Sequence, residues 1–160
     1  MAGVRLLVVF HSRGGATIAL RDALLEGARH ESIEGVEVVV RDVTDATPDD
    51  VLTADGIALV TPERFGSMAG LVKDFFERVY YEVIDQSGSP HRPGLPYILV
   101  VKGGYDGQGT VTSVEKIATG LRWRRVLDPA VVTGHPTEQH LEAIAELGAT
   151  FAAGLGERIF

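Results

Sequence analysis

The sequence predicts an α/β fold in which a parallel β-sheet is covered by helices on both faces. Short apolar runs rich in β-branched residues alternate along the chain with segments of helical periodicity. The runs are almost continuously apolar, as expected for strands that are covered on both faces. With 160 residues, the chain is long enough to form one domain, residues 1–160, with a full hydrophobic core.

Five runs are predicted to be strands. Right-handed crossovers between about five parallel strands favour the order 2-1-3-4-5, with strands numbered along the chain. In such a sheet, ligands bind beyond the carboxyl ends of the strands, where the strand order reverses. We therefore expect a site in the loops after the first, third and fourth predicted strands. The predicted strands are Val4–Phe10, Val36–Arg41, Ile57–Thr61, Tyr97–Lys102 and Val126–Thr133.

Apolar residues three or four positions apart predict the helices between these strands. The strongest stripe runs from Met68 to Val83, and similar stripes run from Leu20 to Ala28 and from Leu141 to Leu155. A weaker helix is predicted over Thr110–Gly120, closed by its last glycine. A short helix or turn is expected near Pro48–Leu52.

The connection Asp85–Gly94 is rich in Gly, Ser and Pro, so we expect it to be a mobile loop and not a domain boundary.

Composition excludes several classes of protein. The chain has no Cys, which rules out disulfides, zinc–thiolate sites and cysteine catalysis, including the low-molecular-weight tyrosine phosphatases. A net charge of -7 argues against a nucleic-acid partner, because phosphate binding needs a basic face. The apolar run Leu6–Phe10 is too short for a signal peptide or a membrane span, and no later run is long enough. We expect a cytoplasmic protein with no membrane partner and no metal, because no pair of histidines has metal-ligand spacing.

The first loop with unusual composition reads Ser12-Arg13-Gly14-Gly15-Ala16-Thr17. A phosphate group at this point would meet unpaired backbone N–H groups and the positive end of a helix dipole. Glycines let the backbone close around an anion, and the Ser and Thr hydroxyls can donate further hydrogen bonds. The alternative is a tight turn in which Ser12 or Thr17 caps the helix. The stricter glycine motifs of nucleotide triphosphatases and dinucleotide-binding proteins are absent.

The second loop reads Pro62-Glu63-Arg64-Phe65-Gly66-Ser67 and leads into the strongest helix. A strand that ends in Thr-Pro-x-Arg-Phe-Gly-x-Met resembles the flavin-ring loop of the NAD(P)H:quinone oxidoreductases named for the tryptophan-repressor-binding protein, which are related to the NADPH-dependent FMN reductases. The resemblance covers roughly residues 4–155. It implies a flavodoxin-like three-layer sandwich that binds FMN.

The same resemblance assigns roles to the second loop. The backbone of Glu63–Gly66 and the side chain of Arg64 would line the edge of the isoalloxazine ring. A donor-rich, positively charged loop near N1 and O2 would favour the anionic reduced ring. Phe65 would pack on the ring or seal the pocket. The alternative is a proline-bearing strand-to-helix turn in which Arg64 is solvated.

The first loop also resembles a flavodoxin element, the phosphate loop Ser/Thr-x-Thr-Gly-x-Thr. The chain matches this pattern at Ser12, Gly15 and Thr17. Gly14 replaces a hydroxyl residue, so one donor is missing, and Arg13 would supply charge in its place.

The third loop reads Lys102-Gly103-Gly104-Tyr105-Asp106-Gly107-Gln108-Gly109-Thr110. Its four glycines allow close approach of the backbone to a flat ligand. Relatives have a glycine-rich loop here, often with a polar amide, and Gln108 is the nearest match. Lys102 stands where relatives more often have a small hydroxyl residue. Tyr105 could stack on a ligand or orient a substrate, and the alternative is an exposed flexible turn.

These observations leave three functions open. The first is an FMN-dependent oxidoreductase that passes hydride from NAD(P)H to a quinone-like or other small acceptor. The second is a flavodoxin-type electron carrier, and the third is a flavin-free binding domain with the same fold. The first is favoured, since flavodoxins lack the Arg-Phe string. No side chain need bond covalently to substrate, so no catalytic residue is predicted beyond Tyr105 and Arg64 as tuning residues. The resemblance also implies a homo-oligomer, a dimer or tetramer.

Overall fold

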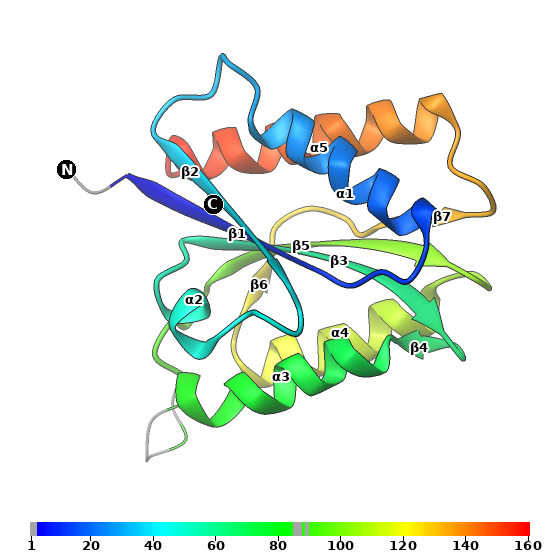
Figure 1. The fold of residues 1–160 in the computed structure, drawn as a ribbon. Helices are drawn as coiled ribbons and strands as arrows, with labels where there is room; N and C mark the ends of the chain where they lie inside the picture. The colour runs from blue at the N-terminus through cyan, green and yellow to red at the C-terminus, as the bar shows by residue number, and fades with distance from the viewer. Residues whose placement is uncertain (1–2, 85–87, 89) are drawn as a thin grey trace.

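The computed structural model describes residues 3–84, 88 and 90–160, and its centre is a seven-stranded sheet (Figure 1). The path through the sheet is β2-β1-β3-β5-β6, while β7 pairs with β5 and β4 pairs with β3. The three short strands are β4 (Ser67–Met68), β6 (Arg124–Arg125) and β7 (Ala130–Thr133). Every pairing is parallel except that of β4 with β3. The predicted strand order is therefore confirmed. The four longest strands are β1 (Val4–Phe10), β2 (Val36–Asp42), β3 (Gly56–Arg64) and β5 (Pro96–Gly103).

Helices cover both faces of the sheet (Figure 1). The helices α1 and α5 lie on one face, and α2, α3 and α4 lie on the other. Their bounds are α1 (Gly15–Ala28), α2 (Pro48–Leu52), α3 (Gly70–Val83), α4 (Gln108–Gly120) and α5 (Glu138–Gly156). Within the described part of the chain, no helix is both long enough and apolar enough to cross a membrane.

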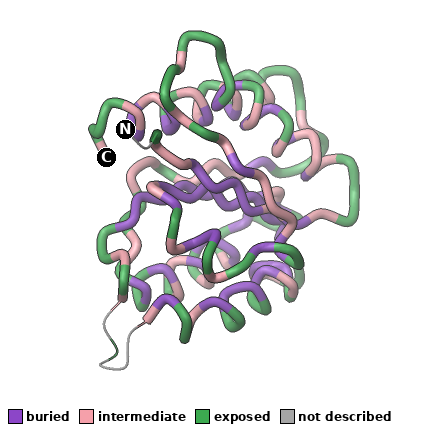
Figure 2. The backbone as a smooth tube through the Cα atoms, turned by 60° about the vertical axis from the view of Figure 1, so that its left-hand side comes forward, coloured by how far each residue is buried: buried purple, intermediate pink, exposed green. Residues whose placement is uncertain are grey.

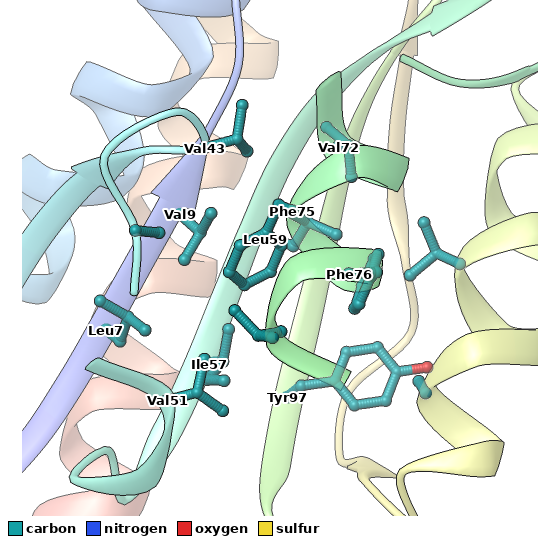
Figure 3. Close-up of a cluster of buried hydrophobic side chains, with 14 of the residues drawn as sticks. Leu7, Val9, Val43, Val51, Ile57, Leu59, Val72, Phe75, Phe76 and Tyr97 are labelled. Atoms are coloured by element: carbon teal, nitrogen blue, oxygen red, sulfur yellow. The ribbon is translucent and has the colours of Figure 1, made fainter. Parts of the chain in front are cut away.

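The strand pleat divides the core into two clusters. Leu6 and Val8 of β1 point toward α1 and α5, whereas Leu7 and Val9 point toward α3. Figure 3 shows the second cluster, in which residues of β1 and β3 meet Phe75 and other side chains of α3. Figure 2 shows that burial is concentrated in the central strands. Burial of both faces of β1, β3 and β5 explains their almost continuous hydrophobic runs.

The pair α1 and α5 packs closely because of glycine. A Cβ at Gly27 would lie 1.7 Å from the carbonyl oxygen of Ala145, and one at Gly148 would lie 2.2 Å from that of Leu24. The two helix backbones can approach to this distance only where neither residue has a side chain. The predicted stripe of α1 is buried at Leu20, Ala23, Leu24, Gly27 and Ala28.

The prediction of a loop over Pro62–Ser67 is wrong. The strand β3 continues to Arg64 and turns back into β4 (Ser67–Met68), so the segment is a β-hairpin. The two turn residues, Phe65 and Gly66, have φ of 51° and 74°. Positive φ at both positions is typical of the tight turn whose twist matches that of paired strands. As a consequence, Met68 belongs to β4 and the helix begins only at Gly70.

The predicted strand Val126–Thr133 is wrong in its first half, because residues 126–129 form no strand. The chain forms β6 (Arg124–Arg125) and β7 (Ala130–Thr133), both parallel to β5. Pro129 stands between them, and it has no N–H to donate and disfavours regular geometry in the preceding residue. This edge of the sheet is therefore interrupted. The loop predicted over Asp85–Gly94 lies partly outside the described residues.

Candidate functional site

The three unusual loops meet at the carboxyl ends of β1, β3 and β5. Together they enclose a cavity of about 270 Å³. Its wall is formed by residues 14–17 of the first loop, 62–64 of β3 and 102–104 at the end of β5. Segments up to 90 positions apart thus form a single site, at the edge of the sheet where the strand order reverses.

The first loop presents the start of α1 to this cavity. Gly14 is the N-cap of α1, and no side chain caps the helix. The interpretation in which Ser12 or Thr17 caps the helix is therefore wrong. Ser12 Oγ instead accepts a hydrogen bond from the N–H of Gly14 at 3.0 Å, which shapes the loop. The first N–H groups of α1 have no partner within the helix and remain available to an anion.

The glycines of the first loop are not required by packing. A Cβ at Gly14 or at Gly15 would meet no atom within 4 Å. Gly14 has φ of -154°, which any residue adopts. The absence of side chains therefore leaves open space beside the exposed helix start. That space is the kind of cradle in which a phosphate group can approach backbone N–H groups closely.

The hairpin contributes both buried and exposed residues. Pro62 and Glu63 are buried, whereas Arg64 is exposed and its guanidinium donates to the carbonyl oxygen of Glu63 at 3.5 Å. Phe65 stands at the tip of the hairpin, 99% exposed, and neither it nor Gly66 belongs to the cavity wall. The predicted second loop is thus divided. Residues 62–64 line the cavity, and residues 65–66 form the hairpin turn outside its wall.

The third loop is also divided. Gly103 and Gly104 line the cavity, but Tyr105 is 72% exposed and lies outside the wall, as do Gln108 and Gly109. The structure gives Gly109 a packing role, since a Cβ there would lie 1.7 Å from the carbonyl oxygen of Gly66. The start of α4 therefore rests directly on the hairpin turn.

Lys102 lines the cavity although the sequence analysis did not select it as a site residue. Its Nζ donates to the carbonyl oxygen of Gly103 at 3.0 Å. Lys102 could have been predicted as a site residue, because it ends a predicted strand and directly precedes two glycines. Each of the three loops therefore contains one cationic side chain, although the net charge of the whole chain is -7. These side chains belong to Arg13, Arg64 and Lys102.

The side chain of Glu63 links two of the loops. Its Oε1 accepts hydrogen bonds from the backbone N–H of Gly104, at 3.0 Å, and from that of Tyr105. Its Oε2 is buried and has no hydrogen-bond partner among the described residues. The sequence pattern alone gave this side chain no role.

His11 is buried at the end of β1, directly before the first loop. Burial lowers the pKa of its imidazole below 6.5, the nearby cations Arg13 and Arg64 lower it further, and Asp42 opposes them. The ring is therefore neutral at pH 7.

Comparison with known proteins gives both a family and a fold. A family model described as "NADPH-dependent FMN reductase" matches residues 11–138. A flavodoxin from Aquifex aeolicus is 40% identical over 75 residues, which cover 47% of this chain and 40% of the flavodoxin. An NAD(P)H dehydrogenase (quinone) from Acidithiobacillus ferrooxidans is 35% identical over a match that covers 46% of each protein. The chain thus matches less than half the length of these curated relatives.

Solved structures confirm the flavodoxin-like fold. A flavodoxin from the domain Archaea superposes with a TM-score of 0.79 at 18% identity, over 95% of this chain and 99% of that one. A WrbA-like flavodoxin from Agrobacterium tumefaciens gives 0.76 at 18% identity, over 97% and 98%. The residues of the cavity fit a phosphate group such as that of FMN, because an uncapped helix start, an open glycine cradle and the cationic side chains of Arg64 and Lys102 line one space.

Proposed function

Because the chain belongs to the NADPH-dependent FMN reductase family, we propose that it is an oxidoreductase that passes hydride from NAD(P)H through FMN to a quinone-like or other small acceptor. The observation that carries this proposal is the cavity at the carboxyl ends of β1, β3 and β5. It combines an anion-binding helix start with an open glycine cradle and with Arg64 and Lys102. We further propose that the protein acts in the cytoplasm, where NAD(P)H is supplied, as a homo-oligomer.

Each loop has a distinct task in this proposal. The N–H groups of Gly15, Ala16 and Thr17 bind the phosphate, and Ser12 holds the loop in shape through Gly14. The ring end of the cofactor then extends toward residues 62–64 and 102–104, which form the rest of the wall. When bound, FMN supplies the hydride chemistry.

The side chains contribute electrostatics and access rather than covalent chemistry. Arg64 and Lys102 place positive charge beside the ring end, which favours the negative charge of a reduced flavin. Tyr105 and Phe65 stand exposed at the tips of the two loops beside the cavity, where they can contact a substrate that enters from solvent. The remaining contribution of the protein to hydride transfer is to orient the hydride donor and the acceptor over one face of the flavin ring.

A second function, a flavodoxin-type electron carrier, is favoured by a different observation. The chain superposes on 99% of an archaeal flavodoxin, with almost no additional segment that could form a separate substrate pocket. A carrier would hold a stable one-electron form of FMN and react slowly with NAD(P)H. A flavin-free binding domain of the same fold would bind no FMN at all.

The test is to saturate the purified protein with FMN, remove free ligand, and record the visible spectrum before and after anaerobic addition of NADH or NADPH. Stoichiometric flavin that is bleached directly to the two-electron form supports the reductase. Bound flavin that resists NAD(P)H and shows one-electron bands on slow chemical reduction makes the protein a carrier. No retained flavin contradicts both functions and favours the flavin-free domain.

A further inference from the structure

Glu63 is a buried carboxylate beside the cavity. Glu63 is 4% exposed, whereas the neighbouring Arg64 is exposed. Among the described residues, no Lys, Arg or His forms a salt bridge with it. Burying an ionised carboxylate without a counter-ion is costly, so other groups must stabilise it.

Two backbone donors stabilise one oxygen of this carboxylate. Oε1 accepts from the successive N–H groups of Gly104 and Tyr105, which lie 41 and 42 positions further along the chain. Successive N–H groups that converge on one oxygen form a small anion-binding concavity. The side chain therefore ties the loop after β5 to the end of β3.

The other oxygen is left without a partner. Oε2 is buried and accepts no hydrogen bond from any described residue. A buried acceptor without a donor carries an uncompensated desolvation cost. Both Glu63 and Gly104 belong to the cavity wall. A donor on a ligand in the cavity would remove this cost.

We propose that Glu63 is a positioning residue that clamps the Tyr105 loop to β3 and offers Oε2 to a donor at the ring end of the bound cofactor. The clamp stands on the structure alone, whereas the contact with the cofactor rests on the proposed function.

The charge of Glu63 has a predictable effect on redox chemistry. A fixed negative charge beside the ring end opposes the anionic reduced flavin, and so it offsets Arg64 and Lys102. Glu63→Gln removes the charge but keeps an oxygen that can accept from both backbone N–H groups. Relative to oxidised FMN, reduced FMN should then bind about tenfold more tightly, which corresponds to a rise of about 30 mV in the two-electron midpoint potential.

The clamp is tested first, on protein without cofactor, by hydrogen exchange at the amides of Gly104 and Tyr105. Glu63→Ala should speed exchange there at least about tenfold, while Glu63→Gln should leave it close to that of the wild type. Unchanged exchange in Glu63→Ala overturns the clamp whether or not the protein binds FMN. If Glu63→Ala fails to fold, Glu63→Met, which keeps the length of the side chain but has no oxygen, is compared with Glu63→Gln at the same two amides, and equal exchange in the two overturns the clamp.

The second test measures the midpoint potential of the FMN complex for the wild type, for Glu63→Gln and for Asp106→Asn. Asp106 is an exposed acid in the same loop, so water screens its charge and its substitution should barely change the potential. A rise with Glu63→Gln alone supports the proposal. Equal shifts in both variants, or none in either, overturn the contact with the ring end. Failure of the wild type to bind FMN overturns the proposed function and this contact, while the exchange experiment still decides the clamp.

Discussion

Glycines serve opposite purposes in two regions of this molecule. Between α1 and α5, Gly27 and Gly148 are glycine because any side chain would collide with the backbone of the facing helix. At the cavity, Gly14 and Gly15 have open space on the side where a side chain would project. Gly27 and Gly148 allow the two helices to pack against each other, whereas Gly14 and Gly15 leave space in the cavity. A glycine that packing does not require, at the rim of a cavity, therefore indicates a binding site.

The largest effect should come from breaking the first region with Gly27→Ala. Alanine gains about 1 kcal/mol of helix propensity, but overpacking against the carbonyl of Ala145 costs up to about 3 kcal/mol. We expect the free energy of unfolding to fall by about 2 kcal/mol in a urea titration. Gly120→Ala is the matched control, because a Cβ there meets Tyr80 only at an ordinary 3.7 Å. Equal stability of Gly27→Ala and the wild type would contradict the close helix contact.

In contrast to Gly27→Ala, Gly15→Ala should weaken FMN binding and leave stability almost unchanged. Gly15 is the first residue of α1, and an added methyl group would occupy the cradle without touching the protein. Stability should stay the same or rise by less than about 1 kcal/mol, while the Kd for FMN should rise at least about tenfold, or about 1.4 kcal/mol.

The control for Gly15→Ala is Gly70→Ala. Gly70 is the first residue of α3, it also has open space around its missing Cβ, and it does not line the cavity. Calorimetric titration with FMN should find no change in this variant. A similar loss of affinity in both variants would mean that the cradle is not the binding site.

The hairpin turn offers a third test, because Phe65 occupies a conformation that suits Gly or Asn. Its φ is 51°, in the left-handed region, where most side chains cost roughly 1–2 kcal/mol. Phe65→Asn should raise the free energy of unfolding by about 1 kcal/mol. If stability rises while turnover with NAD(P)H and a quinone falls, the strained residue is retained for function. A loss of stability would show that the exposed ring contributes packing.

The smallest expected effect concerns His11 and pH. Since burial lowers its folded pKa below 6.5, the unfolded chain binds the proton more readily, and stability is lost as the pH falls below 6.5. The free energy of unfolding of the wild type should fall more between pH 7 and pH 5 than that of His11→Gln, and the difference between the two falls should be less than about 1 kcal/mol. Substituting the exposed His135 by Gln should leave the slope unchanged. A slope in His11→Gln equal to that of the wild type would contradict this assignment.

Much of the fold could be predicted because its signals are local. The continuous apolar run of β1 and the helical stripes of α1, α3 and α5 can be read directly from the sequence. The hairpin was missed because its turn reads Phe65-Gly66 and not the Asn-Gly or Asp-Gly that signals a tight turn. The break at Pro129 could have been predicted, since a proline inside a strand is itself a signal.

The site was predictable as three loops but not as a set of contacts. The order of the strands fixes which loops meet, and residues 14–17, 62–64 and 103–104 do line one cavity. Tyr105, Gln108 and Gly109 share the third loop with the lining residues but lie outside the wall. The bonds from Glu63 to residues 104 and 105 join segments about 40 positions apart, which no spacing pattern shows.

The central claim, that FMN occupies the cavity between the three loops, is tested most directly by NMR titration of the backbone amides with FMN. We expect the largest shifts at Gly14–Thr17, Glu63–Arg64 and Lys102–Gly104, and none at the packing glycines Gly27 and Gly148. Shifts centred elsewhere, or no saturable shifts at all, would contradict it.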